Sequence, residues 1–502
     1  EYSAVPVVLD RVSFRKSAIM ARDRLVLSGA SGTRLVNRYK WENEDCDFDP
    51  EERLQSYFAQ CQKANVGREI PVYSGLLEPD IDFAIECRNT FNYYHFMTES
   101  LSQLALLAGL DFQGHIYFHF PNPEVKQRPF AVAFVEALFP EYEGRVFFER
   151  APKDYNRVLT AYDLLGGHFQ APPAQTTGLE KLAPTGKTAK NNLNDHASLS
   201  VLGMNSVSSA LIALRRRALN AVAGGNYDHL PRRFFVGRDE RQSRARHMEG
   251  EDFLFNHLQM FGFEYVVFES LEPLEQIALM ARAEVMISYH GAGFTNLLFA
   301  NPKSTVIEVG TLQTAQFRWG DFWPLAHTSQ CRYVTFFGDF NSENPKVEPN
   351  FSQEGIVPVA LSKEAIGEVM AFVVGILGQY PELSDAQDLM KMARRLYQVS
   401  ACDQALGLLD AHRDMVLKNL DLCLLKADCH KKQLETKSEL VALDDAFKAD
   451  PTRWQTLVRM IWCANHCERP QVIRWALARL QVDFPDRHAA FLSNHEWVRY
   501  VA

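Results

Sequence analysis

The feature that most constrains the fold of this chain is an alternation of short apolar runs with amphipathic runs. In the first stretch it predicts strands at 81–86, 115–120 and 145–148, with helices at 93–108 and 130–138 between them. Strands and helices that alternate at this spacing are typical of a parallel sheet with crossover helices. This part of the chain is therefore predicted to be α/β.

The same alternation returns after a helix predicted at 208–222. The expected strands are 233–237, 264–268, 285–288 and 305–309, separated by helices at 250–261, 273–283 and 293–299. A longer, mostly apolar helix at 361–377 would close the series. We therefore expect a second α/β unit of the doubly wound kind.

Other parts of the chain lack this alternation. Residues 1–80 are interpreted as irregular, and 171–208 as a loop between domains. After residue 384 the strand signals end, and amphipathic helices are expected at 393–409, 415–433, 440–449, 453–466 and 470–482. Their order resembles helix pairs of the tetratricopeptide kind. The predicted domains are 1–207, 208–380 and 384–502.

Composition limits the classes of partner and compartment. The 502 residues carry a net charge of −9, which gives no general attraction to nucleic acid. The longest apolar run, 369–377, is about half the ~20 residues of a membrane span. The nine scattered cysteines suit reduced thiols, and the first residues do not form a signal peptide pattern. These features predict a soluble, cytoplasmic protein.

The cysteines and histidines between 423 and 467 make a zinc site conceivable. They lie in strongly helical sequence without a Cys-x-x-Cys pair, which argues against zinc. We therefore predict that the protein has no metal site.

The segment from His290 to Gly293 follows a predicted buried strand and leads directly into a helix. The two glycines allow a sharp turn and close approach of a ligand, and N–H groups at a helix N-terminus favour phosphate. His290 and Asn296 can hydrogen-bond to phosphate or ribose. A tight strand-to-helix turn with a structural histidine fits the local sequence equally well.

Four arginines follow another predicted strand, between residues 238 and 246. The planar guanidinium group suits phosphate oxygens and stays charged. Arg238 and Arg244 are the favoured anion contacts, and the alternative is a solvated loop with weak surface ion pairs. Glu308, which ends the strand at 305–309, suits ribose hydroxyls or the capping of a neighbouring turn.

His95 and Glu99 are four residues apart at the start of a predicted helix that Thr90 or Asn92 would cap. They therefore share one helix face, where a carboxylate can orient an imidazole and raise its basicity. Such a pair can remove a proton from a hydroxyl, and a surface pair without chemistry is the alternative.

Together these segments, in this order, resemble glycosyltransferase family 61. The family pattern includes an Asn/His-rich segment ending in His-x-x-x-Asp/Glu, matched by Asn92, His95 and Glu99. An Arg-rich loop follows at 238–251, where Met248 replaces an Asn of the pattern. The most specific match is His290-Gly291-Ala292-Gly293-Phe294-Thr295-Asn296, followed by a strand ending in Glu308.

The resemblance implies an α/β GT-B architecture: two Rossmann-like domains, followed here by the all-α helical-repeat region. Residues 1–207 would bind the acceptor and 208–380 the nucleotide sugar. It also implies an inverting mechanism without a metal or other cofactor, in which arginines and helix-end N–H groups stabilise the departing diphosphate.

The resemblance also assigns roles to the candidate residues. His95 would be the base, because an imidazole titrates near neutral pH, and Glu99 would orient it, although Glu99 could itself be the base. Asn92 would contact the acceptor. The donor would be bound by Arg238, Arg244, His290, Gly291, Ala292, Gly293, Asn296 and Glu308.

The predicted activity is transfer of a sugar, most readily from a UDP-sugar, to a glycan or lipid-linked glycan in surface polysaccharide synthesis. We expect the bacterial type of enzyme, in the cytoplasm or at the inner face of the membrane, with partner or homo-oligomer contacts through its C-terminal helices. Two alternatives remain open. One is a transferase for CMP-linked Kdo or sialic acid, and the other is a non-catalytic helical-repeat adaptor.

Overall fold

The computed structural model is of mixed α/β type, with parallel strands in its middle part and a helical C-terminal region. It describes residues 1, 3–15, 18–21, 24–27, 47–49, 52, 56, 78–87, 92–119, 129–149, 151, 153–163, 168–169, 207–238, 248–318, 321–350 and 354–500. The chain divides into two compact units: unit 1 is 1–245 with 265–335, and unit 2 is 246–264 with 336–502. The three domains predicted from the sequence stay a prediction.

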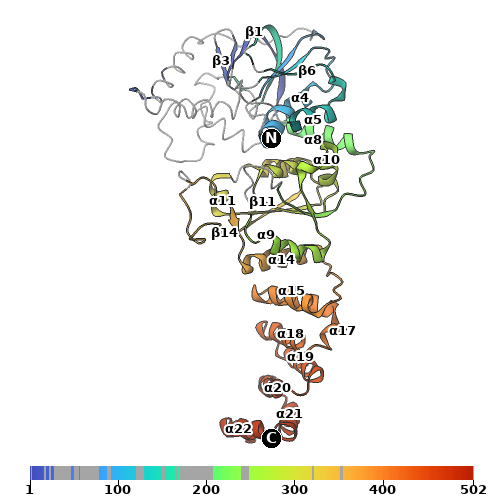
Figure 1. Ribbon diagram of the computed structural model, residues 1–502, viewed down its shortest axis with the longest axis vertical. Helices are drawn as coiled ribbons and strands as arrows, with labels where there is room; N and C mark the ends of the chain where they lie inside the picture. Colours follow the sequence, from blue (N-terminus) through green and yellow to red (C-terminus); the bar gives the residue numbers. More distant parts are fainter. Residues whose placement is uncertain are drawn as a thin grey trace. The chain divides into compact units, whose positions relative to one another are not determined.

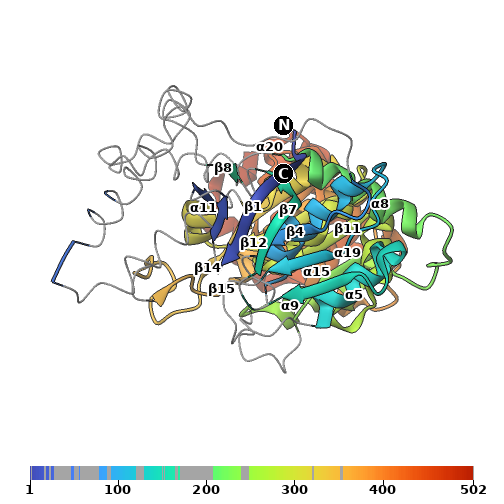
Figure 2. The same ribbon diagram turned by 90° about the horizontal axis from the view of Figure 1, so that it is seen from above.

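The N-terminal sheet of unit 1 has the strand order β6-β5-β4-β7-β1-β2-β3-β8. Strands β4, β5, β6 and β7 run parallel, whereas β1, β2, β3 and β8 join them through antiparallel pairs, and β1, β7 and β4 lie side by side (Figure 2). The strands are β1 Val5–Arg15, β2 Ala18–Ala21, β3 Arg24–Leu27, β4 Phe83–Glu86, β5 Ile116–His119, β6 Val146–Glu149, β7 Lys153–Tyr162 and β8 His168–Phe169.

Five strands of this sheet correct the sequence prediction, namely β1, β2, β3, β7 and β8. Residues 1–80 were expected to be irregular, yet β1 pairs along most of its length with β7, which was not predicted either. In β1 the buried positions shift phase, since Leu9 faces the core and so do Val12 and Phe14. Arg11, between them, has a left-handed φ of 53°. This shift hides the two-residue period of a strand. The sheet is mixed rather than purely parallel because β1 runs antiparallel to β7.

The second sheet has the strand order β10-β9-β11-β12-β13, with β9, β11 and β12 parallel. Its strands are β9 Arg233–Val236, β10 Glu264–Val266, β11 Val285–Tyr289, β12 Thr305–Gly310 and β13 Arg332–Phe337. Counted along the chain this order is 2-1-3-4-5, a common doubly wound order. The strand order reverses between β9 and β11, and in such sheets ligands bind where the strands end at this switch point.

Helix α8, Ser209–Val222, packs against helices of both sheets in unit 1 (Figure 1). Arg217 donates to the Leu138 carbonyl on one side, and Arg215 donates to the Leu298 carbonyl at 2.6 Å on the other. One hydrophobic core contains residues of both sheets and of α8. The other helical elements of unit 1 are α3 Tyr93–His95, η1 Phe96–Leu101, α4 Ser102–Leu104, η2 Ala105–Leu107, α5 Pro129–Leu138, η3 Pro140–Tyr142, η6 Phe268–Ser270, α10 Pro273–Arg282, η7 Ala292–Phe299, α11 Leu312–Arg318 and α12 Trp323–Ser329.

Unit 2 is mainly helical. It holds α9 Glu251–Leu258, η5 Gln259–Phe261, β14 Asp339–Phe340, β15 Val359–Ala360, α14 Lys363–Leu377, α15 Ala386–Gln398, α16 Cys402–Ala411, α17 Arg413–Val416, α18 Leu420–Lys432, α19 Thr436–Ala449, α20 Trp454–His466, α21 Pro470–Asp483, α22 Pro485–Asn494 and η8 Glu496–Tyr500. The repeat class of these helices stays a prediction. None of the helices in the described part of the chain combines the length and apolar composition needed to cross a membrane.

Two long helices predicted in this region are each divided in two. The helix expected at 393–409 is interrupted at Ser400, whose φ of 63° is left-handed. The helix expected at 415–433 is interrupted at Asn419, whose side chain accepts hydrogen bonds from the N–H groups of Asp421 and Leu422 and so begins a new helix.

Candidate functional site

The first candidate pair lies at the start of the helical segment that begins at Tyr93. His95 Nδ1 is 2.7 Å from Glu99 Oε1, and the side chains are 16% and 5% exposed. Asn92 caps the segment, because its side-chain oxygen accepts a hydrogen bond from the His95 backbone N–H at 3.3 Å. With the carboxylate as acceptor, Nδ1 donates and Nε2 carries the lone pair of the ring.

A helical segment forms at the position predicted for the helix at 93–108. It is not a regular α-helix, however, because its middle part, η1, is a π-helix. In a π turn each backbone hydrogen bond spans five residues instead of the four of an α-helix. Some backbone carbonyls therefore accept hydrogen bonds from side chains instead of from backbone N–H groups. Thr98 donates to the Tyr94 carbonyl and Ser102 to the Thr98 carbonyl, each at 2.7 Å, and Gln103 donates to the Glu99 carbonyl at 2.6 Å. These buried polar side chains fix the turn that carries Glu99.

The second pair spans two parallel strands. His290 follows β11, and its Nδ1 lies 2.5 Å from Oε1 of Glu308 in β12. Tyr333 of β13 donates to the other carboxylate oxygen of Glu308. Glu308 is 3% exposed, so its carboxylate faces these two partners rather than open solvent. Burial, followed by the charge of Glu308, raises the pKa of Tyr333, which therefore remains a neutral hydrogen-bond donor.

Arg238 joins this pair from the end of β9, on the other side of the switch point. Its Nη2 donates to the His290 carbonyl at 2.7 Å, and its guanidinium lies 5.0 Å from the centre of the Tyr289 ring. A Cβ at Gly291 would lie 2.1 Å from this Nη2. Gly291 has extended backbone, so the glycine is required here for space rather than for its φ.

Contacts within unit 1 connect the two pairs. The Tyr93 hydroxyl donates to Asn296 Oδ1 at 2.7 Å, which links α3 directly to η7. A second link runs through rings: Tyr94 contacts His95, Phe322 contacts Tyr94, and His290 contacts Phe322, with ring centres 5.2, 5.9 and 5.2 Å apart. The two carboxylate-bound imidazoles therefore belong to one assembly of side chains.

The structure brings most of the predicted site residues together. Arg244 is outside the described residues. Asn296 is fully buried between Tyr93 and Gln276. Sequence reasoning missed Tyr93, Phe322 and Tyr333. Tyr93 lay within the predicted Asn/His-rich segment, whereas only the fold could reveal the other two.

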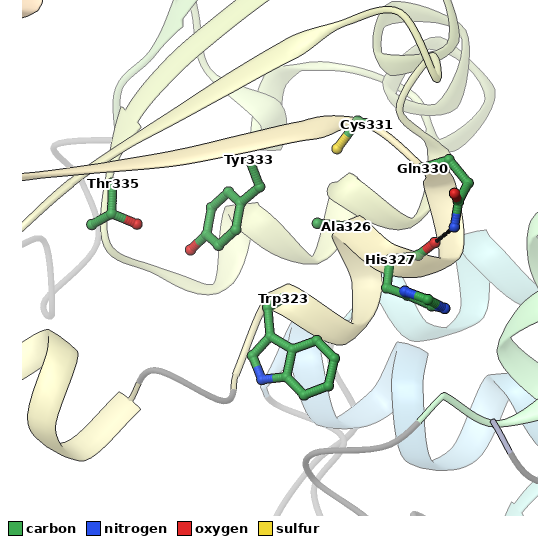
Figure 3. A pocket seen from close by; sticks show the side chains of 7 residues that line it. All are labelled: Trp323, Ala326, His327, Gln330, Cys331, Tyr333 and Thr335. Atoms are coloured by element: carbon green, nitrogen blue, oxygen red, sulfur yellow. Dashed lines mark hydrogen bonds between the residues drawn. The ribbon is translucent and has the colours of Figure 1, made fainter.

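A pocket of about 440 Å³ lies beside the second pair, between α12 and β13. Figure 3 shows the Trp323 indole and the Tyr333 phenol approaching it from these two elements. Across the described residues, no group of three or more His, Cys, Asp and Glu side chains is arranged to hold a metal ion.

Comparison with protein-family models gives a match for the middle of the chain. Residues 93–307, which include His95, Glu99 and His290 and end one residue before Glu308, match the model described as Glycosyltransferase 61. A comparison with curated proteins finds no match. This match supports assignment of residues 93–307 to glycosyltransferase family 61, and a glycosyltransferase implies a sugar donor and an acceptor.

Proposed function

We propose that the protein is an inverting, metal-independent transferase of GT-B type. It moves a sugar from a nucleotide donor, most readily a UDP-sugar, to a hydroxyl of a glycan or lipid-linked glycan in surface polysaccharide synthesis. The observation that carries this proposal is the pair of carboxylate-bound imidazoles, His95–Glu99 and His290–Glu308, joined within one unit. One imidazole serves the acceptor and the other serves the donor.

His95 is the base of the proposed reaction. Its Nε2 takes the proton of the acceptor hydroxyl, and the acceptor oxygen forms a bond to the anomeric carbon. The bond from that carbon to the donor phosphate breaks at the same time, and its electron pair leaves with the nucleotide. Glu99 accepts from Nδ1 at 2.7 Å, which orients the ring and stabilises the imidazolium that forms.

The donor phosphates are stabilised at the switch point. His290, as an imidazolium, donates from Nδ1 to Glu308 and from Nε2 to a phosphate oxygen. Arg238 lies beside it, and the first N–H groups of η7, from Ala292 to Gly293, point out of the helix N-terminus. In this proposal Arg244 adds a second guanidinium, while Glu308 and Asn296 act by holding His290 and Tyr93.

A nucleotide panel tests the proposal. UDP, GDP and CMP are added separately to the full chain, and thermal unfolding is followed with and without EDTA. A ligand at 100 times its Kd stabilises by about 2.7 kcal/mol, so we expect UDP to raise the Tm and EDTA to have no effect on this rise. Stabilisation by CMP alone would favour an acidic-sugar donor instead, and no response to any of the three would contradict the proposal.

Product stereochemistry tests the mechanism. NMR of the product formed from an α-linked UDP-sugar should show a β-linkage, because a single displacement inverts the anomeric carbon. A product that keeps the α-configuration would contradict the single displacement while leaving the transferase assignment intact.

A further inference from the structure

The pocket between α12 and β13 has the size of a small-molecule site. Its volume of about 440 Å³ lies within the range of about 300–1,000 Å³ that ligand pockets occupy. It is lined by Trp323, Ala326, His327, Gln330, Cys331, Tyr333 and Thr335 (Figure 3).

The chemistry of this lining favours an uncharged ring that bears hydroxyl groups. The described residues that line it include aromatic faces, an amide and a hydroxyl, but no Lys, Arg, Asp or Glu. An aromatic face packs against the apolar C–H groups of a sugar ring, and the amide and hydroxyl groups can pair with sugar hydroxyls. A phosphate would find no guanidinium or ammonium group here, in contrast to the switch point with Arg238.

One residue of the pocket lining, His327, interacts with a charged group. His327 Nε2 lies 3.2 Å from the Glu1 carboxylate, and both side chains are about half exposed, at 47% and 60%. Solvent screens such a pair strongly, so it contributes little to the preference of the pocket.

Two residues connect the pocket to the second histidine–carboxylate pair. Tyr333 lines the pocket and donates its hydroxyl hydrogen to Glu308, which binds His290. Trp323 follows Phe322, whose ring contacts His290. A ligand in this pocket would therefore touch side chains that hold the Glu308–His290 pair in place.

We propose that this pocket is a subsite for an uncharged sugar ring of the substrates and that Tyr333 is the positioning residue that links it to Glu308 and His290. The inference rests on the proposed transferase function. The ring belongs either to the donor or to the acceptor, and both sources present the same chemistry to Trp323.

Replacement of Trp323 separates these two sources. Calorimetry measures the affinities of Trp323→Ala for UDP, UDP-glucose, UDP-xylose and UDP-N-acetylglucosamine. Ligand-detected NMR measures binding of the corresponding methyl glycosides with UDP present. Trp475→Ala, which removes a 42% exposed indole from α21 in unit 2, is the matched control.

If the ring is the donor sugar, the affinity for the preferred UDP-sugar falls about tenfold or more while that for UDP is unchanged. If it is the acceptor sugar, methyl glycoside binding is lost and UDP-sugar affinity is unchanged.

A second variant covers the case in which Trp323→Ala does not fold. Thr335→Val removes only a hydroxyl and should weaken binding of the same ligand, UDP-sugar or methyl glycoside, by a smaller factor. The subsite proposal is overturned if Trp323→Ala folds and binds both kinds of ligand as the control does. It is also overturned if Trp323→Ala does not fold and Thr335→Val changes neither affinity. The proposed transferase function survives loss of the subsite proposal if the wild type binds UDP-sugars. A wild type that binds none of UDP, GDP and CMP would contradict both the transferase function and the subsite.

Tyr333→Phe tests the positioning role, because it removes the hydroxyl and keeps the ring. We expect the donor KM to rise about tenfold or more with kcat nearly unchanged, and the pH profile of kcat/KM to shift as Glu308 loses a hydrogen bond. Tyr155→Phe is the control, since it removes a hydroxyl bonded to His119 at 2.7 Å in the N-terminal sheet. A wild-type pH profile and a wild-type donor KM for Tyr333→Phe would overturn the positioning role.

Discussion

The two histidine–carboxylate pairs have nearly the same local geometry but are built in different ways. His95 and Glu99 are four residues apart in one helical segment, and Gln103 donates to the Glu99 backbone. His290 and Glu308 are 18 residues apart on neighbouring parallel strands, and Tyr333 of a third strand donates to Glu308. The first pair depends on one π turn, and the second depends on the register of a sheet. We interpret the difference as a division of labour between acceptor activation and donor binding.

Substitution of the two histidines should give the largest effects and should separate the two roles. His95→Ala is expected to lower kcat by about 10²–10⁴-fold without changing nucleotide affinity, because it removes the base alone. His290→Ala is expected to weaken nucleotide binding, because it removes a phosphate contact. Steady-state kinetics and calorimetry with UDP measure both effects.

His115→Ala is the control for this pair of variants, since its side chain is 54% exposed and lies beside Asp82. If His95→Ala and His290→Ala reduced nucleotide affinity equally, the two imidazoles would not have separate roles. Full activity of His95→Ala would contradict its assignment as base.

The carboxylates should give the next largest effects. Glu99→Gln and Glu308→Gln keep the size of the side chain but remove its charge, so neither imidazolium is stabilised. A group that orients an active-site histidine typically contributes about 10–100-fold. We expect Glu99→Gln to act on kcat and Glu308→Gln to act on donor KM, as measured by the same kinetics. If Glu99→Gln changed kcat and donor KM equally, the first pair would also contact the donor.

A third histidine shows what burial does without a carboxylate. His119 ends β5, is 3% exposed, and its Nε2 is 2.7 Å from the Tyr155 hydroxyl. Burial, followed by the positive charge of Lys153, lowers the pKa of His119 to about 3. The ring is therefore neutral in the folded protein at pH values where an ordinary histidine in the unfolded chain binds a proton.

The sign of the resulting pH dependence follows from this difference. Between the unfolded pKa of about 6.5 and the folded pKa of about 3, the unfolded state binds more protons, so the free energy of unfolding falls as pH decreases and is unaffected above this window. From pH 7 to pH 5 we expect a loss of about 2 kcal/mol that His119→Gln does not show. Urea unfolding at the two pH values measures this, with His115→Gln as control. Identical losses in wild type and His119→Gln would contradict the burial argument.

The sequence predicted those parts of the site that depend on local spacing. The four-residue separation of His95 and Glu99 placed them on one helix face, and the Gly-rich turn after the strand at 285–288 located His290 and the start of η7. The pairing of His290 with Glu308 was not predictable, because it depends on the register that places Ser288 opposite Glu308 in neighbouring strands. Spacing along one chain does not determine that register.

The sequence pattern also failed to reveal three other features of the folded chain. The π turn has the apolar spacing of an ordinary helix, so only the hydrogen bonds of Thr98, Ser102 and Gln103 distinguish it. Tyr333 lies in a strand that was not predicted, and Arg11 concealed the period of β1. Apolar periodicity reports none of these three features, because it does not record hydrogen-bond partners, backbone dihedral angles or strand pairing.

The smallest expected effect compares two glycines of one turn. Gly291→Ala would place a Cβ 2.1 Å from the Arg238 guanidinium and must displace that side chain from the His290 carbonyl. Gly293→Ala would place a Cβ 3.4 Å from the Phe268 ring, which is an ordinary contact. We expect nucleotide affinity to fall about tenfold in Gly291→Ala, the equivalent of about 1.4 kcal/mol, and to change less than about twofold in Gly293→Ala.

Calorimetry with UDP measures both glycine variants, and Arg238→Ala shows which group is responsible. Because Gly291→Ala acts by displacing Arg238, the double variant Gly291→Ala/Arg238→Ala should bind UDP no more weakly than Arg238→Ala alone. Additive losses would show instead that the added methyl group blocks the phosphate directly. The second pair would then depend on an open backbone at η7 rather than on the position of Arg238.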